Sequence, residues 1–435
     1  MSIKQTVEQK TAALKSVLKK GALHIFTGSF ITKFATFFGS VFIVRVLSKE
    51  EFGVLGYIEN LFNYTYVLAG MGLLNALLRY VVLAKEKEQK LSYYRYVIRF
   101  STVFNVVLIA AAAVLFSLYP HPADFASAAW LMPLLLLSLP FRSLFDSQNS
   151  MQRAMFDNKR YAFWGALVSV LSIAVKFLLS WAFGITGAVA SSIVVYVVFV
   201  GVLSVYVNRV YFTGITPDSL SKPMKKEINK YSIQYMITNS IWTIFMLNDV
   251  LLLGQLTGNA AVVAEYKVAY VLPANLSLIS ASIGVFVAPY FVKHETEPAW
   301  IKRTYGKVFG VSALLIGAAA AVLFVFAEPI IMLLYGQDYI NIVPVMRVLL
   351  IGAFVNTALR YTNANLLAAM GHIRQNMLIS LAGVLVQLGA NIFVIPAYGA
   401  MGVAWTSVAV YAAMAAALML VFWIKILSNK AGEQT

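Results

Sequence analysis

Cysteine is absent from the chain, and histidine and acidic residues are scarce. Without cysteine the protein has no disulfide bond, no thiolate nucleophile and no thiolate metal ligand. The four histidines (His24, His121, His294 and His372) are scattered and show no metal-binding spacing. The sequence also has no phosphate-binding G-x-x-x-x-G-K-[ST] loop and no pair of catalytic carboxylates. It therefore predicts a protein that is not an enzyme, with no catalytic residue, no metal site and no cofactor.

Charge is scarce as well, because only 12% of the residues are charged while 60% are hydrophobic. Soluble domains have about 25% charged and about 45–50% apolar residues, so this chain lies outside the soluble globular class. Apolar segments of roughly 20 residues, which as helices cross about 30 Å of hydrocarbon, fill most of the chain. We predict an all-α polytopic membrane protein with 12 transmembrane helices, at 22–46, 54–80, 97–119, 127–149, 161–182, 184–206, 232–254, 266–291, 306–327, 345–369, 376–396 and 400–424.

The basic residues outnumber the acidic ones by 34 to 18, which gives a net charge of +16. Most of them lie near the two termini and in every second connection, for example Lys85, Lys87 and Lys90, or Lys225 and Lys226. By the positive-inside rule, both termini are expected in the cytoplasm. The basic excess is thus a signal of membrane topology, and no nucleic-acid partner is predicted.

Residues 2–20 are polar and rich in lysine, and the apolar run that follows them is too long for a signal peptide. We expect this segment to form an amphipathic helix on the inner membrane surface.

Three stretches of the first half recur in the same order in the second half. They are FGITGAVASSIVVY (183–196) and YGAMGVAWTSVAVY (398–411), LSKEEFGVLGY (47–57) and LTGNAAVVAEY (256–266), and AAAAVLF at 110–116 and 318–324. Glycine pairs followed by small residues also occur in ordinary helix packing. The shared order of the three stretches nevertheless favours two equivalent sets of six helices. Because six is even, both sets start on the same side of the membrane, which makes the repeat parallel.

The repeat sets the expected domain organisation. We expect an N-terminal six-helix bundle at 1–206, a cytoplasmic linker at 207–230, a C-terminal six-helix bundle at 231–427 and a cytoplasmic tail at 428–435.

Cations inside predicted spans are costly and therefore mark candidate functional residues. Three of them, Lys33, Lys176 and Arg360, lie on polar stripes that include Ser29, Thr36, Ser172, Asn356 and Asn363. Such stripes predict a hydrated cationic cavity that binds an anionic ligand, and arginine in particular suits phosphate. Arg79, Arg142 and Arg347 are further candidates, although they lie close enough to helix ends to reach the membrane surface instead.

Carboxylates also occur inside the predicted spans, at Glu59 and Asp249, with Asp146 near the end of another span. A carboxylate in this setting either carries a coupling ion, Na⁺ or H⁺, or neutralises a neighbouring cation. The sequence leaves both roles open for Glu59 and Asp249.

The chain resembles the polysaccharide flippases of the multidrug/oligosaccharidyl-lipid/polysaccharide exporter superfamily, the Wzx-type O-antigen translocases. The resemblance rests on loose motifs that keep their order over nearly the whole chain. These motifs are Arg45-x-Leu47-x-x-x-x-Phe52-Gly53, Asp249-x-x-Leu252-Leu253-Gly254, Tyr266-x-x-Ala269, Tyr335-Gly336 with Tyr339, Gly371, and Asn391 with Ile395-Pro396-x-Tyr398-Gly399-x-x-Gly402.

This resemblance implies two six-helix bundles that form a V around a central cavity. It also implies movement of an undecaprenyl-pyrophosphate-linked oligosaccharide from the cytoplasmic to the periplasmic leaflet of the bacterial inner membrane by alternating access. The expected partners are the lipid-linked anionic glycan, Na⁺ or H⁺ in antiport, and a polysaccharide assembly complex.

Two alternative functions remain, a cation-coupled multidrug exporter and a non-transporting scaffold of an envelope polysaccharide complex. The cationic residues argue against cationic drugs, and the polar stripes argue against a scaffold.

Overall fold

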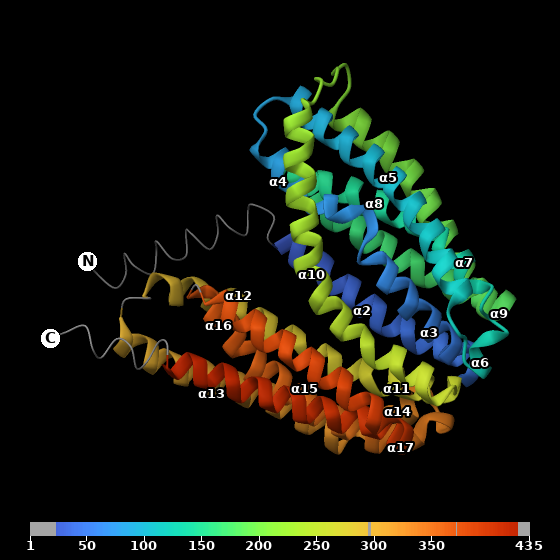
Figure 1. Cartoon of the computed structure of the whole chain (residues 1–435), viewed down its shortest axis with the longest axis vertical. Coiled ribbons are helices and arrows are strands. Elements are labelled where there is room, and N and C mark those ends of the chain that lie inside the picture. Colours follow the sequence, from blue (N-terminus) through green and yellow to red (C-terminus); the bar gives the residue numbers. More distant parts are fainter. Residues whose placement is uncertain (1–22, 295–296, 371, 425–435) are drawn as a thin grey trace. The chain divides into compact units, whose positions relative to one another are not determined.

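The computed structural model describes residues 23–294, 297–370 and 372–424, and in these ranges the chain forms helices and no β-strand (Figure 1). The predicted amphipathic segment 2–20 and the predicted tail 428–435 lie outside the described residues. The chain divides into two compact units. Unit 1 comprises Met1–His121 and Phe125–Ile244, and unit 2 comprises Pro122–Asp124 and Phe245–Thr435.

In unit 1, the long helix α9 lies along α2 and α8, and α4 and α5 pack against α8 (Figure 1). The helices of this unit are α2 (Leu23–Val46), α3 (Lys49–Tyr66), the short η2 (Ala69–Gly72), α4 (Leu73–Leu83), α5 (Lys87–Leu118), α7 (Leu131–Leu136), α8 (Ser138–Ala154), α9 (Asn158–Tyr211) and the first part of α10 (Lys222–Thr257). The short α6 (Ala123–Ala126) has residues in both units.

In unit 2, α15 packs between α11, α13 and α17. This unit contains the second part of α10, α11 (Ala260–Asn275), α12 (Ser277–Lys293), α13 (Pro298–Val325), α14 (Ala327–Tyr335), η3 (Gln337–Ile342), α15 (Val343–Phe354), the π-helical η4 (Val355–Tyr361), α16 (Thr362–Ala369) and α17 (Ile373–Phe422).

The predicted spans all fall on helices, and the prediction of an all-α polytopic membrane protein is confirmed. Among the described residues, seven helices are long and apolar enough to cross a membrane, or eight if the bent pair Lys49–Tyr66 and Ala69–Leu83 counts as one span. Two of the seven, α9 with 54 residues and α17 with 50, each cover two predicted spans. Helices suit this setting because hydrocarbon offers no partner for an unpaired backbone group.

Each of these two long helices is broken at a glycine of the duplicated stretch. Gly184 in α9 has φ 58° and Gly399 in α17 has φ 50°, a left-handed conformation that glycine adopts without a side-chain clash. The two glycines are equivalent positions of the duplicated stretch, since both stand second in it. The chain therefore makes the same turn in each half.

The predicted span 54–80 is not one continuous helix, because α3 and α4 meet at an angle of 45°. The break contains three successive residues with positive φ, Gly70, Met71 and Gly72. The connection between α9 and α10 is also shorter than the predicted linker 207–230, since only residues 212–221 lie outside helices. The two units divide at Ile244, within α10.

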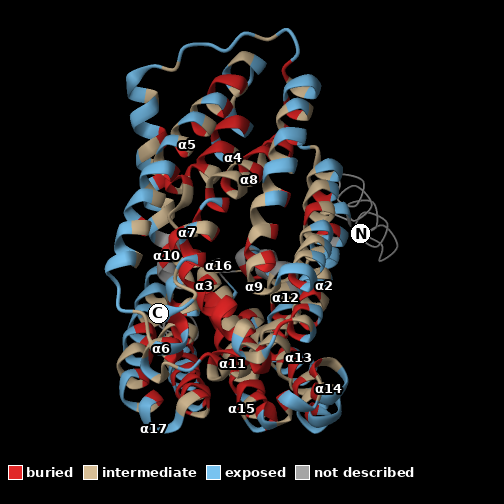
Figure 2. Ribbon diagram, turned by 90° about the vertical axis from the view of Figure 1, so that its right-hand side faces the viewer, coloured by how far each residue is buried: buried red, intermediate tan, exposed pale blue. Residues whose placement is uncertain are grey.

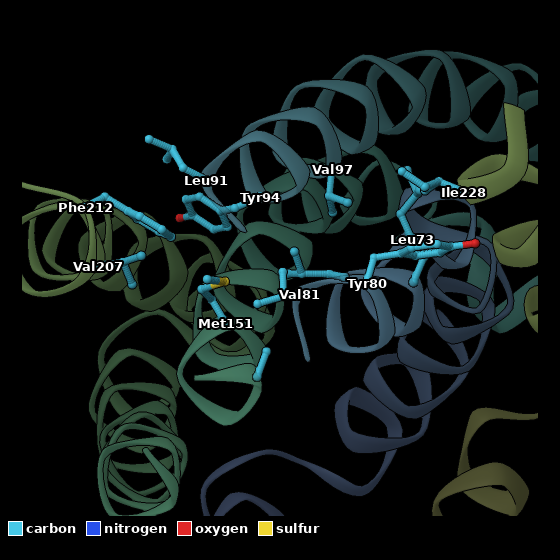
Figure 3. Packing of buried hydrophobic residues seen from close by; sticks show 13 residues of the cluster. Leu73, Tyr80, Val81, Leu91, Tyr94, Val97, Met151, Val207, Phe212 and Ile228 are labelled. Atoms are coloured by element: carbon cyan, nitrogen blue, oxygen red, sulfur yellow. The ribbon is translucent and has the colours of Figure 1, made fainter. Parts of the chain in front are cut away.

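Burial follows the helix faces, with buried residues toward neighbouring helices and exposed ones on outer faces (Figure 2). Many exposed side chains are large and apolar, such as Leu118 at 77%, Trp181 at 76% and Phe393 at 82% exposure, as expected for surfaces that contact lipid. Within unit 1, a buried cluster joins α4, α5, α8, α9 and α10 (Figure 3). It includes Leu73, Leu77, Leu91, Met151, Val207 and Ile228.

We predict that Gly72→Ala destabilises the protein by about 2 kcal/mol or more, because left-handed backbone and overpacking each cost on the order of 1–3 kcal/mol. Gly72 has φ 72°, and an added Cβ would lie 2.6 Å from the backbone oxygen of Ser232 in α10. Thermal unfolding of the purified protein in detergent measures the effect. Gly306→Ala is the matched control, because nothing lies within 4 Å of its added Cβ. Equal melting temperatures for both variants would contradict this account of the bend.

Candidate functional site

Two clusters of polar residues lie inside the helical units, one in each. The N-site in unit 1 consists of Glu59, Lys176, Arg142, Asp146, Tyr66 and Ser192. The C-site in unit 2 consists of Asp249, Tyr266, Gln387, Asn391 and Ser407.

The N-site contains an ion pair between Lys176 of α9 and Glu59 of α3, with Nζ and Oε1 2.5 Å apart. Their side chains are 22% and 33% exposed. The pair lies at a cavity of about 240 Å³ that Glu59 lines together with Asn63, Ser138, Arg142 and Ser192. Two groups that the sequence offered separately, a candidate anion-binding cation and a candidate ion-coupling acid, thus neutralise each other.

A second part of the N-site links α8 to α3. The Tyr66 hydroxyl donates a hydrogen bond to the Asp146 carboxylate, and the Arg142 guanidinium carbon lies 4.1 Å from the centre of the Tyr66 ring. Arg142 and Asp146 are one helical turn apart on α8. The tyrosine therefore contacts both charges, with its ring over the cation and its hydroxyl on the anion.

The C-site holds one carboxylate, Asp249 of α10, in a cage of uncharged donors. Tyr266 donates its hydroxyl proton to Oδ2 at 2.9 Å, and the amide nitrogens of Gln387 and Asn391 donate to Oδ1 at 2.8 and 3.0 Å. Gln387 also donates to the Ser407 hydroxyl at 3.2 Å. Asp249 is 9% exposed, and its three donors and Ser407 are at most 3% exposed. Polar donors thus replace the water that a carboxylate loses on burial.

The amide oxygens of Gln387 and Asn391 are buried and have no hydrogen-bond partner among the described residues. Rotation of an amide group by 180° exchanges its nitrogen and its oxygen. Such a rotation would turn two oxygens toward Asp249, and with Ser407 they would form a set of oxygen ligands around a carboxylate. Carboxylate, amide and hydroxyl oxygens suit hard cations such as Na⁺. The C-site can therefore hold either hydrogen bonds or a cation at the same carboxylate.

The two sites occupy equivalent positions of the two halves. With the offset of the duplicated stretch, Ser172, Lys176 and Ser192 of α9 correspond to Gln387, Asn391 and Ser407 of α17. The acids differ in origin, since Glu59 comes from α3, the second helix of its half, and Asp249 from α10, the first helix of its half.

The remaining predicted cations lie in different surroundings. Lys33 on α2 is exposed and has no hydrogen bond or ion pair among the described residues. Arg79 is exposed, with its guanidinium carbon 5.1 Å from the centre of the Tyr231 ring. Arg347 donates from Nε to the Phe324 backbone oxygen at 3.2 Å, in the last turn of α13, where a cation is favourable because the helix end is negative.

Arg360 is 3% exposed, and its Nε donates to Asn356 Oδ1 at 2.6 Å. Asn363, one turn further along, accepts a hydrogen bond from Tyr305 at 2.7 Å. Both residues are thus held by protein groups. Ser29 and Thr36, in contrast, are exposed on α2, and the Thr36 hydroxyl donates to the Thr32 backbone oxygen. Ser172 has a buried hydroxyl with no hydrogen-bond partner among the described residues.

Sequence reasoning missed three members of the C-site as site residues, Tyr266, Gln387 and Ser407. Two of them carried a signal, because Gln387 and Ser407 are the equivalents of Ser172 and Ser192 in the repeat. Tyr266 stood in a quoted motif, but its distance from Asp249 depends on how α10 and α11 pack.

Comparison with known proteins identifies the group to which these features belong. The family described as "Polysaccharide biosynthesis protein" matches residues 42–344, which is more than half of the chain. No curated protein sequence matches the chain.

Solved structures share the fold. A multidrug resistance MATE family transporter of the MOP superfamily, in an inward-facing conformation, is 16% identical with a TM-score of 0.74, covering 93% of this chain and 96% of that one. The lipid II flippase MurJ, in an inward closed conformation, is 14% identical with a TM-score of 0.74, covering 94% and 91%. A MOP superfamily transporter from Pyrococcus furiosus is 14% identical with a TM-score of 0.61, covering 96% of both chains. The chain thus shares the fold of these three proteins.

We predict that Lys176→Met destabilises the protein by about 1–3 kcal/mol, because a partly buried carboxylate loses its partner. The double variant Glu59→Gln/Lys176→Met should recover most of that loss, since it removes both charges. Thermal unfolding of the wild type, the two single variants and the double variant in detergent gives the coupling between the two positions. Additive effects of the two substitutions would show that the ion pair does not hold α3 to α9.

Proposed function

The chain belongs to the family of polysaccharide biosynthesis proteins, and on this premise we propose that it is a flippase for an undecaprenyl-pyrophosphate-linked oligosaccharide. It moves this lipid from the cytoplasmic to the periplasmic leaflet of the bacterial inner membrane by alternating access. Both termini lie in the cytoplasm, and each half of the chain forms one bundle. The family match carries the proposal, together with the transporter fold.

The charges inside the apolar helices support an anionic cargo. A pyrophosphate carries several negative charges, and desolvated cations in a helix are tolerated best where they meet an anion. Lys33 supports this role most directly, because its ammonium group is exposed and has no ion pair among the described residues. We therefore propose Lys33 as a contact of the pyrophosphate. Lys176 is neutralised by Glu59, so we assign it to the structure of the N-site.

We propose that Asp249 holds the coupling ion. Glu59 already has a counter-ion in Lys176. The hydrogen bonds that the Asp249 carboxylate accepts, in contrast, come from the uncharged side chains of Tyr266, Gln387 and Asn391. A carboxylate with neutral neighbours can gain one positive charge and become neutral. Binding and release of a cation at this point therefore change the net charge of the bundle interior. Either Na⁺ with oxygen ligands or a proton on the carboxylate fulfils this role.

The flippase proposal predicts that cells without the protein accumulate an undecaprenyl-pyrophosphate oligosaccharide, because its synthesis continues while its export stops. Lipid extraction and mass spectrometry measure the accumulation, and resistance of the glycan to enzymes added outside spheroplasts places it in the inner leaflet. Lys33→Ala should give the same accumulation at normal protein abundance. Arg79→Ala is the control, because we assign Arg79 to the contact with Tyr231. Loss of drug resistance without accumulation would instead indicate a multidrug exporter.

The ion proposal predicts that Asp249→Asn, which keeps the shape of the side chain, lowers transport at least about tenfold, a loss of roughly 1.4 kcal/mol in coupling. It should also abolish any rise in melting temperature that Na⁺, compared with K⁺ or choline, gives the purified protein, because a ligand stabilises the state that it binds. Glu59→Gln/Lys176→Met is the control and should keep the Na⁺ response. If Na⁺ has no effect, transport driven by a pH gradient should still be lost in Asp249→Asn. Wild-type transport by Asp249→Asn under both gradients would refute the assignment.

A further inference from the structure

A basic groove lies on unit 1 where α5 meets the connection to α10, and it shares no lining residue with the N-site. It has a volume of about 480 Å³. Arg95, Arg99 and Lys225 line it together with Tyr96, Phe100 and Val103. The Lys225 ammonium lies 5.9 Å from the centre of the Tyr96 ring. The connection forms one wall of the groove, and the Ser92 hydroxyl fixes it by donating to the Asp218 backbone oxygen at 2.8 Å.

The charge of the groove favours an anion. Arg95 and Arg99 are exposed and one helical turn apart, and neither has a hydrogen bond or an ion pair among the described residues. Asp218 is the single acid of the lining, against three cations. A second hollow of about 300 Å³ is also lined by Arg95 and Arg99. The two guanidinium groups are thus accessible from both hollows and are free to bind phosphate oxygens with their planar donors.

The groove continues into an apolar surface along the same helix. Val103, Val106 and Val107 are 67%, 59% and 63% exposed. Their spacing from Arg95 and Arg99 places all five residues on one side of α5, since a helix repeats every 3.6 residues. A change from exposed arginine to exposed valine within one turn is expected where lipid headgroups give way to hydrocarbon.

We propose that this groove binds one anionic phospholipid, with its phosphate on Arg95, Arg99 and Lys225 and an acyl chain along Val103 and Val107. A soluble phosphate would use the cations but would leave the valine surface unused. A phospholipid matches both the basic groove and the valine surface. Anionic lipids are enriched where basic residues gather at a membrane. The bound lipid would contact the connection 212–221 between α9 and α10. This proposal does not depend on the transported substrate.

The test is lipid binding to the purified, delipidated full chain, measured by native mass spectrometry and by thermal unfolding. Phosphatidylglycerol should bind with a stoichiometry of one and raise the melting temperature, whereas phosphatidylcholine should not. Arg95→Ala/Arg99→Ala should weaken phosphatidylglycerol binding by about 30-fold, as two basic residues contribute to binding of anionic headgroups. Asp218→Asn should strengthen it, because the groove loses its acid. Lys85→Ala/Lys87→Ala is the control, since it removes two exposed cations outside the groove.

Three outcomes would overturn the proposal. Equal phosphatidylglycerol binding by wild type and Arg95→Ala/Arg99→Ala would place the lipid elsewhere. Inorganic phosphate that displaces the lipid at similar concentration would show a site for the phosphate group alone. The same conclusion would follow if Val103→Asn left phosphatidylglycerol binding unchanged. The double variants should remain folded, because both arginines are exposed and their removal leaves no buried group unpaired.

Discussion

The cost of placing a charged or polar group in hydrocarbon without a partner governs this structure. It explains why the described chain is helical, because a helix satisfies its backbone internally. It also explains the interior of both units, where three acids have defined donors. Glu59 has Lys176, Asp146 has Tyr66, and Asp249 has Tyr266 with two amides. Since every such group requires a neighbour on another helix, the polar contacts fix how the helices pack.

The two halves of the internal repeat neutralise or compensate a buried acid in different ways at the same position. Residues 176 and 391 are equivalent, and each contacts an acid. In the first half the contact is a lysine, so the pair is neutral as built. In the second half it is an asparagine, which donates a hydrogen bond to the acid but supplies no positive charge. A neutral ion pair is not stabilised by a further ion, whereas a buried carboxylate without a counter-ion is stabilised when it binds a cation. We propose that this difference between lysine and asparagine separates a structural site from one that exchanges an ion.

The sequence predicted the spans well and showed the internal repeat, because both depend on local properties. Apolar length defines a span, and Gly184 and Gly399 recur in a pattern that can be read from the chain. The partners of the charges depend on packing between helices, which spacing along one helix does not contain. Lys176 thus looked like a ligand-binding cation until α3 placed Glu59 beside it. Arg347 looked similar, but it caps the end of α13. The break between α3 and α4 was missed because a run of apolar residues looks the same in the sequence whether the helix is straight or bent.

The same comparison between halves bears on how a transporter of this fold can be driven. If both halves held neutral pairs, a cation gradient would have no point of action in the interior. If both held lone acids, the empty protein would bury two uncompensated charges. One of each limits the burial cost to Asp249, whose four neighbouring polar groups lower it without supplying a positive charge. The lipid groove that we propose on α5 follows the same logic, since Arg95 and Arg99 have no hydrogen bond or ion pair within the described ranges. Charges with protein partners hold the helices together, and we propose that those without them bind ligands.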